Sequence, residues 1–342
     1  MFFLSLLITI SLALECTQIL DSSIIAGSHV YIPAGATAPV AIPPNFNCTY
    51  QIKVPKMIFA HVTLENFLKG QNDKIVIRDG LGRMNTVTSR NFPILQFYVF
   101  PNTITTFQVT TKSVDVGSKF HLTVNYLPMP EPEVSELGSE LKYFSLNDLE
   151  VSSGLRKKKP QNVFGSDKVV FTTAHFEYSE DKFDNFFIID GSFTAQTAVY
   201  HLPDYLNQNF VSTGNNLTIL GLDTSDDVSS VILSPLSEVQ KYDVFLGVTT
   251  FYEIQSVQLN VPLKKGAVTV ISRHTDYNTI RGIQYFTDKA NCSIKAVTAP
   301  ITDNSTVLLD FATITTFPYT LNHKLFVVVV ENCNVEITMY SD

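Results

Sequence analysis

The sequence predicts an all-β protein built as two antiparallel β-sandwich domains in tandem, and three observations predict it. First, apolar and polar residues alternate with a period of two in segments along the whole chain, which is the pattern of half-buried strands. Second, Trp is absent while Phe and Tyr number 25 and 14, and aromatic and β-branched residues favour strands. Third, two distant stretches follow one template, which indicates a duplicated β domain.

The alternation is clearest in six segments, and each is expected to be a strand. They are YQIKV from Tyr50, AHVTL from Ala60, KIVIR from Lys74, FHLTVNY from Phe120, VQLNV from Val257 and NVEITMY from Asn334. In FHLTVNY, the apolar residues from Phe120 to Tyr126 should face a core, whereas His121, Thr123 and Asn125 should face solvent. Turn-forming stretches such as PPN, KGQND and RDGLGR separate the strands at short intervals, as a sandwich needs.

The first thirteen residues read as a signal peptide. The run MFFLSLLITISLA is apolar and ends with Ser11 and Ala13 at the positions that signal peptidase prefers. It is too short to span a bilayer. We therefore expect cleavage before Leu14 and a secreted, extracellular protein without a membrane span.

The chain length of 342 residues exceeds the size at which one core usually keeps growing. We place one domain over residues 14–130 and a second β-sandwich over residues 161–342. The stretch 131–160 between them is rich in Pro, Glu and Ser and is expected to be a linker. It ends in the basic run Arg156–Lys159, for which a solvated loop, a processing site and an anionic-surface contact are the alternatives. Residues 262–342 either complete the second sandwich or form a third small one.

Four cysteines are expected to form two disulfides. They are Cys16, Cys48, Cys292 and Cys333. Their even number suits a chain with an export signal, and none has the close spacing of a zinc or redox pair. Three connectivities are open, and proximity in the sequence favours Cys16 with Cys48 and Cys292 with Cys333. Each loop closure should contribute roughly 3 to 4 kcal/mol.

Four Asn-X-Ser/Thr triplets are candidate N-glycosylation sites. They begin at Asn47, Asn216, Asn291 and Asn304. Together with an export signal they support an extracellular glycoprotein. Asn47 and Asn291 directly precede a cysteine, where folding competes with modification, so Asn216 and Asn304 are the stronger candidates.

The repeated template supports the duplication. Residues 73–80 read DKIVIRDG and residues 184–191 read DNFFIIDG. Both begin with Asp, end in Asp-Gly and carry apolar residues at alternate positions between. An acidic residue, Glu65 or Glu177, precedes each copy by eight or seven positions. We therefore expect the second domain to be a diverged copy of the first.

The first copy of this template resembles the CUB domain, a jelly-roll β-sandwich of extracellular proteins. The likeness lies in the strand ending in Arg-Asp-Gly, the cysteines before it and the later apolar strand that ends near Ser113. The segment IPPNFNCTYQIKVPKMIFAHVTL from Ile42, with VNYLPMP closing the domain at Pro130, is more similar still to the CUB-like domain of secreted nematode proteins. The resemblance covers about residues 16–128, and it implies a role in innate immune or stress responses without enzymatic chemistry.

The resemblance also implies a calcium site, because many CUB domains hold Ca²⁺ with acidic residues from neighbouring loops. Glu65 and Asp73 match the first two ligands in order. The third ligand position falls on Val114, and Asp115 stands one position beyond it. The alternative is that Asp73 and Asp79 only shape turns by accepting hydrogen bonds. Calcium is the only cofactor that the sequence suggests.

Several function classes lack support in the sequence. The net charge of −8 gives no basic footprint for nucleic acid. The seven histidines have no HxH or HExxH spacing, and no G-x-S-x-G or glycine-rich phosphate loop occurs. We therefore predict no catalytic residues and no enzyme. The leading prediction is a secreted binding or effector protein that recognises a glycan, a microbial surface or an extracellular protein. A structural component of an extracellular matrix or surface coat is the alternative, and a secreted hydrolase is the second alternative.

Overall fold

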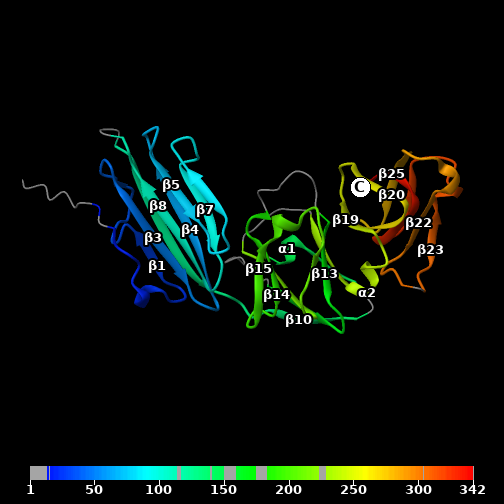
Figure 1. The fold of residues 1–342 in the computed structure, drawn as a ribbon, viewed down its shortest axis with the longest axis horizontal. Helices are drawn as coiled ribbons and strands as arrows, with labels where there is room; N and C mark the ends of the chain where they lie inside the picture. Colours follow the sequence, from blue (N-terminus) through cyan, green and yellow to red (C-terminus); the bar gives the residue numbers. More distant parts are fainter. Residues whose placement is uncertain are drawn as a thin grey trace, which may run out of the picture. The chain divides into compact units, whose positions relative to one another are not determined.

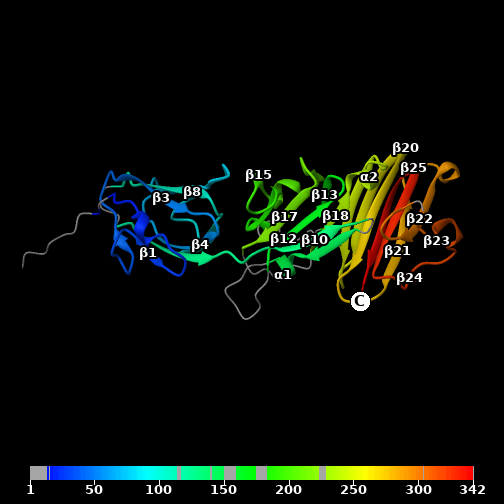
Figure 2. The same ribbon diagram turned by 90° about the horizontal axis from the view of Figure 1, so that it is seen from below.

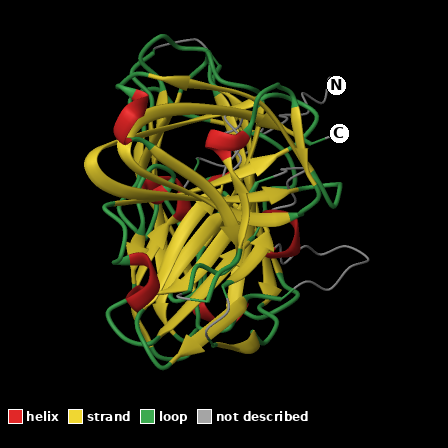
Figure 3. Ribbon diagram, turned by 90° about the vertical axis from the view of Figure 1, so that its right-hand side faces the viewer, coloured by secondary structure: helices red, strands yellow, loops and turns green. Residues whose placement is uncertain are grey.

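A computed structural model describes residues 14, 16–113, 117–138, 141–149, 159–174, 183–222, 229–302 and 304–341. The chain divides into two compact units, Met1–Met129 and Pro130–Asp342 (Figure 1). Strands form nearly all of the regular structure, as Figure 3 shows in yellow. The expected signal peptide and residues 156–158 of the basic run lie outside the described residues. Within the described ranges, no helix is long and apolar enough to cross a membrane.

The first unit is an antiparallel β-sandwich. One sheet has the order β1-β9-β4-β7, with β2 also pairing β9, and the other has the order β3-β8-β5-β6. The strands are β1 (His29–Ile32), β2 (Val40–Ala41), β3 (Asn47–Val54), β4 (Ile58–Phe67), β5 (Lys74–Arg78), β6 (Met84–Val87), β7 (Ile94–Val99), β8 (Thr103–Thr110) and β9 (Lys119–Pro128), after the short 3-10 helix η1 (Asp21–Ser23). Side chains from both sheets, including Tyr50, Leu64 and Phe107, form one core.

The period-two segments are strands, as predicted: they lie in β3, β4, β5, β9, β20 (Gln255–Ser272) and β25 (Leu325–Tyr340). In β9, Phe120 and Tyr126 are fully buried, as expected. One expectation for this strand is wrong. His121 was expected to face solvent but is 2% exposed, because the ring of Tyr31 stacks against its imidazole at 5.6 Å.

The second unit begins with another sandwich. Its sheets have the orders β10-β12-β17-β14-β15 and β11-β18-β13-β16. The strands are β10 (Glu133–Leu137), β11 (Lys142–Ser145), β12 (Gln161–Gly165), β13 (Val169–Ala174), β14 (Phe186–Gly191), β15 (Gln196–His201), β16 (Phe210–Val211), β17 (Asn216–Gly221) and β18 (Ser230–Pro235), with α1 (Leu146–Leu149), η3 (Leu202–Tyr205) and α2 (Leu236–Val239). The pairing of β10 with β12 is parallel. Leu217, Phe171 and Phe186 lie in the core between the sheets.

The two sandwiches share their strand order. The sheet path β3-β8-β5-β6 has the same sequence of strands as β12-β17-β14-β15, and β9-β4-β7 matches β18-β13-β16. The two template copies, residues 73–80 and 184–191, accordingly contain β5 and β14, which hold equivalent places in their sheets. This common topology agrees with the duplication that the sequence template indicates.

Part of the segment expected to be a linker forms strands. Within residues 131–160, β10 joins the sheet of β12, and β11 pairs with β18. Both strands lie at an edge of their sheets, and edge strands carry exposed polar residues. This explains why the composition of the segment resembles that of a linker.

A third, seven-stranded sheet follows. Its order is β19-β20-β25-β21-β24, and β22 joins β25 to β23 (Figure 2). The remaining strands are β19 (Val244–Thr250), β21 (Asn278–Tyr285), β22 (Ser293–Thr298), β23 (Val307–Asp310) and β24 (Tyr319–Leu321), with the 3-10 helices η4 (Lys289–Asn291) and η5 (Phe311–Thr313). A register shift between Val261 and Lys265 interrupts the long β20–β25 pairing. Buried residues from both sides of this shift, including Leu259 and Val268, belong to one core. The sheet begins at Val244, before the position 262 considered from sequence.

The third sheet packs on the second sandwich through β13 and β18. Ile232 and Ala174 from the sandwich contact Ile271 of β20. Gly247 of β19 allows this approach, because a Cβ there would lie 2.8 Å from Ile232 Cδ1 and 2.9 Å from the Thr173 carbonyl oxygen. Strands β13 and β18 are therefore buried on both faces.

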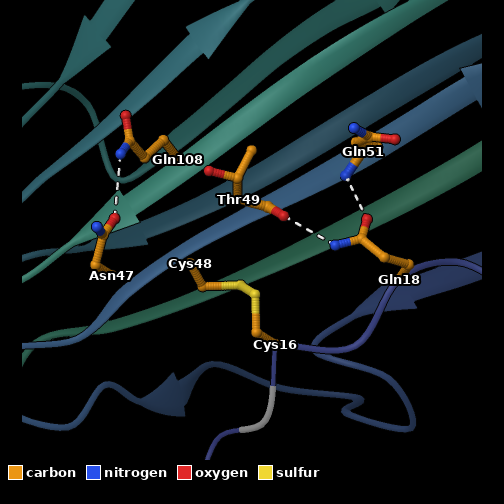
Figure 4. Close-up of a disulfide and its surroundings, with 7 residues drawn as sticks. All are labelled: Cys16, Gln18, Asn47, Cys48, Thr49, Gln51 and Gln108. Atoms are coloured by element: carbon orange, nitrogen blue, oxygen red, sulfur yellow. Dashed lines mark hydrogen bonds between the residues drawn. A yellow bond between two sulfur atoms is a disulfide. The ribbon is translucent and has the colours of Figure 1, made fainter.

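Two disulfides join Cys16 to Cys48 and Cys292 to Cys333, which is the pairing that their positions favoured. Figure 4 shows that the first ties the N-terminal segment to β3. Beside it, Gln18 Nε2 donates to the Thr49 carbonyl at 2.9 Å and Gln18 Oε1 accepts from the Gln51 N–H at 3.0 Å. The disulfide and this clamp together hold the N-terminal segment along β3.

Candidate functional site

The candidate site lies at one end of the first sandwich, around the carboxylate of Asp73. Asp73 immediately precedes β5 and is 2% exposed. Its Oδ1 accepts hydrogen bonds from the N–H groups of Lys112 and Ser113 at 2.9 and 3.2 Å and from Ser113 Oγ at 2.9 Å. Its Oδ2 accepts from Ser118 Oγ at 2.6 Å. One carboxylate therefore connects the chain before β5 to the loop between β8 and β9.

These hydrogen bonds set the charge state of Asp73. Burial alone would raise its pKa, but the bonds from Ser118, Lys112 and Ser113 outweigh burial and hold the pKa below its ordinary value. The folded state therefore favours the carboxylate. The stabilisation is present above the ordinary pKa of an aspartate and is lost as the pH falls through the lowered value.

Gly70 allows the loop before Asp73 to close over this carboxylate. A Cβ at position 70 would collide with Ser113 Oγ and with the Asp73 carboxyl group. The main chain therefore approaches the carboxylate more closely than any other residue type permits.

Glu65 points to a different partner. It lies opposite His121 in the β4–β9 register, and His121 Nδ1 donates to Glu65 Oε2 at 2.7 Å. His121 Nε2 lies 3.1 Å from the Ala36 carbonyl oxygen. Both ring nitrogens thus lie within hydrogen-bonding distance of oxygen atoms. The pair joins β4, β9 and the loop after β1.

Glu65 and Asp73, the two predicted calcium ligands that the structure describes, are engaged with partners within the protein. Ca²⁺ takes six to eight oxygen ligands, but the Asp73 carboxylate already accepts four hydrogen bonds and Glu65 pairs with His121. The described part of the chain holds no group of three or more His, Cys, Asp or Glu that could bind a metal. Asp115 lies outside the described residues, as does Glu177, which precedes the second template copy. Serine hydroxyls and main-chain N–H groups occupy the oxygens of Asp73 instead.

Asp79 shapes a turn, which is the alternative role considered from the sequence. Its Oδ1 accepts from the N–H groups of Leu81 and Arg83 at 3.0 and 2.8 Å, which closes the loop between β5 and β6. Asp73 differs, because its partners come from a loop about forty residues later. In the second sandwich, Asp184 of the template is exposed.

The Glu65–His121 pair also bears on the hydrolase alternative. In a serine hydrolase, the second ring nitrogen of such a histidine meets the nucleophile. Here that nitrogen faces the Ala36 carbonyl, and the imidazole is buried. The contacts of this pair serve to fix strands and a loop.

An exposed apolar group that was not predicted from the sequence lies at this same end of the sandwich and consists of Phe67, Phe92 and Ile94. Phe92 is 80% exposed, and Phe67 and Ile94 are exposed as well. Ile94 lies opposite Glu65, and the Asn66 N–H donates to the Pro93 carbonyl at 2.7 Å. This register places Phe67 and Phe92 next to each other at the end of the sheet. The turn TSRNFP before an apolar strand was the only sequence signal for this group.

A cleft of about 370 Å³ lies beside the carboxylate, lined by Asp73, Ser113 and Ser118 together with Ile42, Pro44, Thr111 and Gly117. The oxygens of Asp73 are engaged within the protein, so the hydrogen bonds serve to hold the cleft wall. The arrangement presents a loop end whose described residues are joined by hydrogen bonds, with apolar side chains on its surface.

The glycosylation triplets differ in accessibility. Asn47, Asn291 and Asn304 are exposed, and Asn47 Oδ1 accepts from Gln108 Nε2 at 3.1 Å (Figure 4). Asn216 is half-buried and accepts from Asn162 Nδ2 at 2.8 Å, while the hydroxyl of Thr218 is buried and donates to the Gly191 carbonyl. Of the two triplets preferred from sequence, Asn304 is accessible to glycosylation and Asn216 is poorly accessible.

Comparisons with known proteins show what the first unit is similar to. No curated protein matches the chain. Among solved structures, the CUB1-EGF-CUB2 domain of human MASP-1/3 is similar at 9% identity, covering 60% of this chain and 98% of that chain, with a TM-score of 0.22. The full extracellular region of zebrafish Gpr126/Adgrg6 is similar at 10% identity, covering 96% of this chain and 52% of that chain, with a TM-score of 0.27. The family model of the CUB-like domain matches residues 12–130, a stretch that corresponds to the first unit of this chain.

Proposed function

We propose that the protein is a secreted, non-enzymatic binding protein that recognises an extracellular partner through the loop end of its CUB-like domain. The CUB-like match over residues 12–130 is the observation that carries the proposal. The two disulfides support an oxidising, extracellular compartment. The partner class is a glycan, a microbial surface or an extracellular protein, and the setting is innate immunity or stress response, as the resemblance to nematode CUB-like proteins implies.

The loop end offers a surface suited to binding. Exposed aromatic and aliphatic side chains on a rigid frame are typical of interaction sites. Phe67, Phe92 and Ile94 provide such side chains, and the four hydrogen bonds of Asp73 fix the frame beside them. Little conformational entropy is lost when a partner binds a surface held in this way.

The test is a binding screen of the purified secreted protein against microbial cells, glycans and extracellular proteins. We expect at least one specific partner, whose affinity falls about tenfold or more when Phe92 is replaced by Ala. Met84→Ala is the matched control, because Met84 is 61% exposed but pairs with Arg78, at the far end of β5 from Asp73. The absence of any partner in all three panels would contradict the proposal.

A further inference from the structure

A second surface suited to binding lies in the second unit, where β13 of the sandwich meets β19 and β20 of the third sheet. A cleft of about 200 Å³ opens there. Its polar lining includes Thr172, Asn207, Gln208, Asn209, Gln255 and Gln258, and none of its lining residues is ionisable. The cleft is therefore rich in amide and hydroxyl groups and carries no side-chain charge.

One wall of the cleft is held rigidly. Thr172 Oγ1 donates to Asn209 Oδ1 at 2.7 Å, and Asn209 Nδ2 donates to the Phe245 carbonyl at 3.1 Å. Thr173 Oγ1 donates to the Leu206 carbonyl at 2.7 Å. These bonds fasten the segment 206–209 to both β13 and β19, so the wall is organised before any ligand arrives.

Other amides of the cleft keep hydrogen-bonding capacity. Asn207 and Gln258 are exposed, and among the described residues neither side-chain amide has a hydrogen-bond partner. Gln255 is 8% exposed and donates only from Nε2 to the Ile254 carbonyl, at 3.3 Å. Each amide offers both donors and an acceptor, and Val248 and Val257 supply apolar surface between them.

An exposed pair of stacked rings includes Tyr252, which lies in the loop between β19 and β20, just before the cleft-lining Gln255. Tyr252 and His274 stack with centroids 5.6 Å apart and planes 14° apart. Phe251 supports both rings, at 4.4 Å from Tyr252 and 4.9 Å from His274. Tyr252 is 59% exposed. It precedes Gln255 by three residues, so their Cα atoms are at most about 11 Å apart.

We propose that this cleft binds an uncharged sugar residue of a glycan and that the Tyr252–His274 pair supports the neighbouring sugar. A sugar ring carries hydroxyls that both donate and accept, which amides match, and apolar C–H faces, which suit valine and aromatic surfaces. A charged ligand would lose its hydration on entering the cleft and would find no side chain of opposite charge there. The inference names a ligand class for one site and rests on the proposed binding function.

The experiment uses the full secreted protein on an array of neutral, sialylated and sulfated glycans, followed by calorimetric titration with the strongest neutral binder. We expect neutral glycans to bind, with no gain from sialic acid or sulfate. The double variant Asn207→Ala/Gln258→Ala should weaken binding about tenfold or more, because several hydrogen bonds are lost. Tyr252→Ala should weaken longer glycans more than single sugars.

Matched controls lie outside the site. Asn260→Ala changes an exposed amide two residues beyond Gln258 on β20, and Tyr319→Ala removes a partly exposed ring on β24. Both should leave affinity unchanged. If glycan affinity is unchanged by the Asn207, Gln258 and Tyr252 substitutions, the cleft is not the binding site. Binding to an extracellular protein without any glycan would overturn the sugar inference and leave the proposed function standing.

Discussion

Asp73 shows how one side chain can fix a loop end. Its four donors come from residues that follow it by 39 to 45 positions in the chain, so neither Asp73 nor the later serines reveal the arrangement alone. An aspartate before a strand fits both a calcium ligand and a hydrogen-bond acceptor, and only the fold distinguishes these roles. The sequence therefore located the site but could not assign its chemistry.

Replacing Ser118 by Ala tests this arrangement. The substitution removes a hydrogen bond to a buried carboxylate, so we expect a loss of about 1.5 to 3 kcal/mol in the free energy of unfolding. Urea denaturation followed by circular dichroism measures it. Ser89→Ala, at an exposed turn position, should change stability by less than about 0.5 kcal/mol. Equal effects of the two substitutions would show that Asp73 does not depend on Ser118.

Tyr126 predicts a response to alkaline pH. Burial raises its pKa to about 12, and its hydroxyl has no partner among the described residues. The neutral phenol is therefore favoured on folding, a stabilisation present below pH about 10 and lost as the pH rises toward 12. Tyr126→Phe should raise stability at neutral pH by about 1 kcal/mol and weaken this alkaline loss. A variant less stable than the wild type would contradict the unsatisfied hydroxyl.

The glycosylation triplets make a separate prediction. Glycans should be found at the exposed Asn304, Asn47 and Asn291 and not at the half-buried Asn216. Peptide mapping of the folded protein, expressed through a secretory pathway and deglycosylated enzymatically, measures occupancy at each position. A fully occupied Asn216 would mean that the β12–β17 contact differs from the one described.

Strands with one buried face were predictable, and strands with two were not. In β3 the residues from Tyr50 to Val54 alternate in burial, and the sequence shows the same alternation. In β13 and β18 nearly every residue is buried, so period two disappears. The edge strand β10 was not predicted for the opposite reason. It is mostly exposed, so its composition resembles that of a linker.

The disulfide between Cys292 and Cys333 joins the start of β22 to the middle of β25. Replacing both cysteines by Ala should cost the second unit about 3 to 4 kcal/mol, because the loop of 41 residues is no longer closed in the unfolded state. Differential scanning calorimetry should show a transition at a lower temperature for the second unit. The transition of the first unit should stay in place, and a shift of both would contradict independent units.

The division into two units predicts that the first folds alone. Residues 14–129 contain their own core and their own disulfide. Expressed in an oxidising compartment, this fragment should unfold cooperatively and show dispersed amide signals in NMR spectra. A fragment without cooperative unfolding would contradict this division. A fragment ending at Pro235 provides the contrast, because it exposes the face of β13 and β18 that the third sheet covers.

The place of β25 has a consequence for biosynthesis. This strand pairs with β20, β21 and β22, so the third sheet cannot assemble until β25 has left the ribosome. Until then Val170, Ala174 and Ile232 of the second sandwich have no cover. The first unit can mature while the chain is still being made, but the second must wait until β25 has been synthesised. In that interval its uncovered apolar residues are open to chaperone binding.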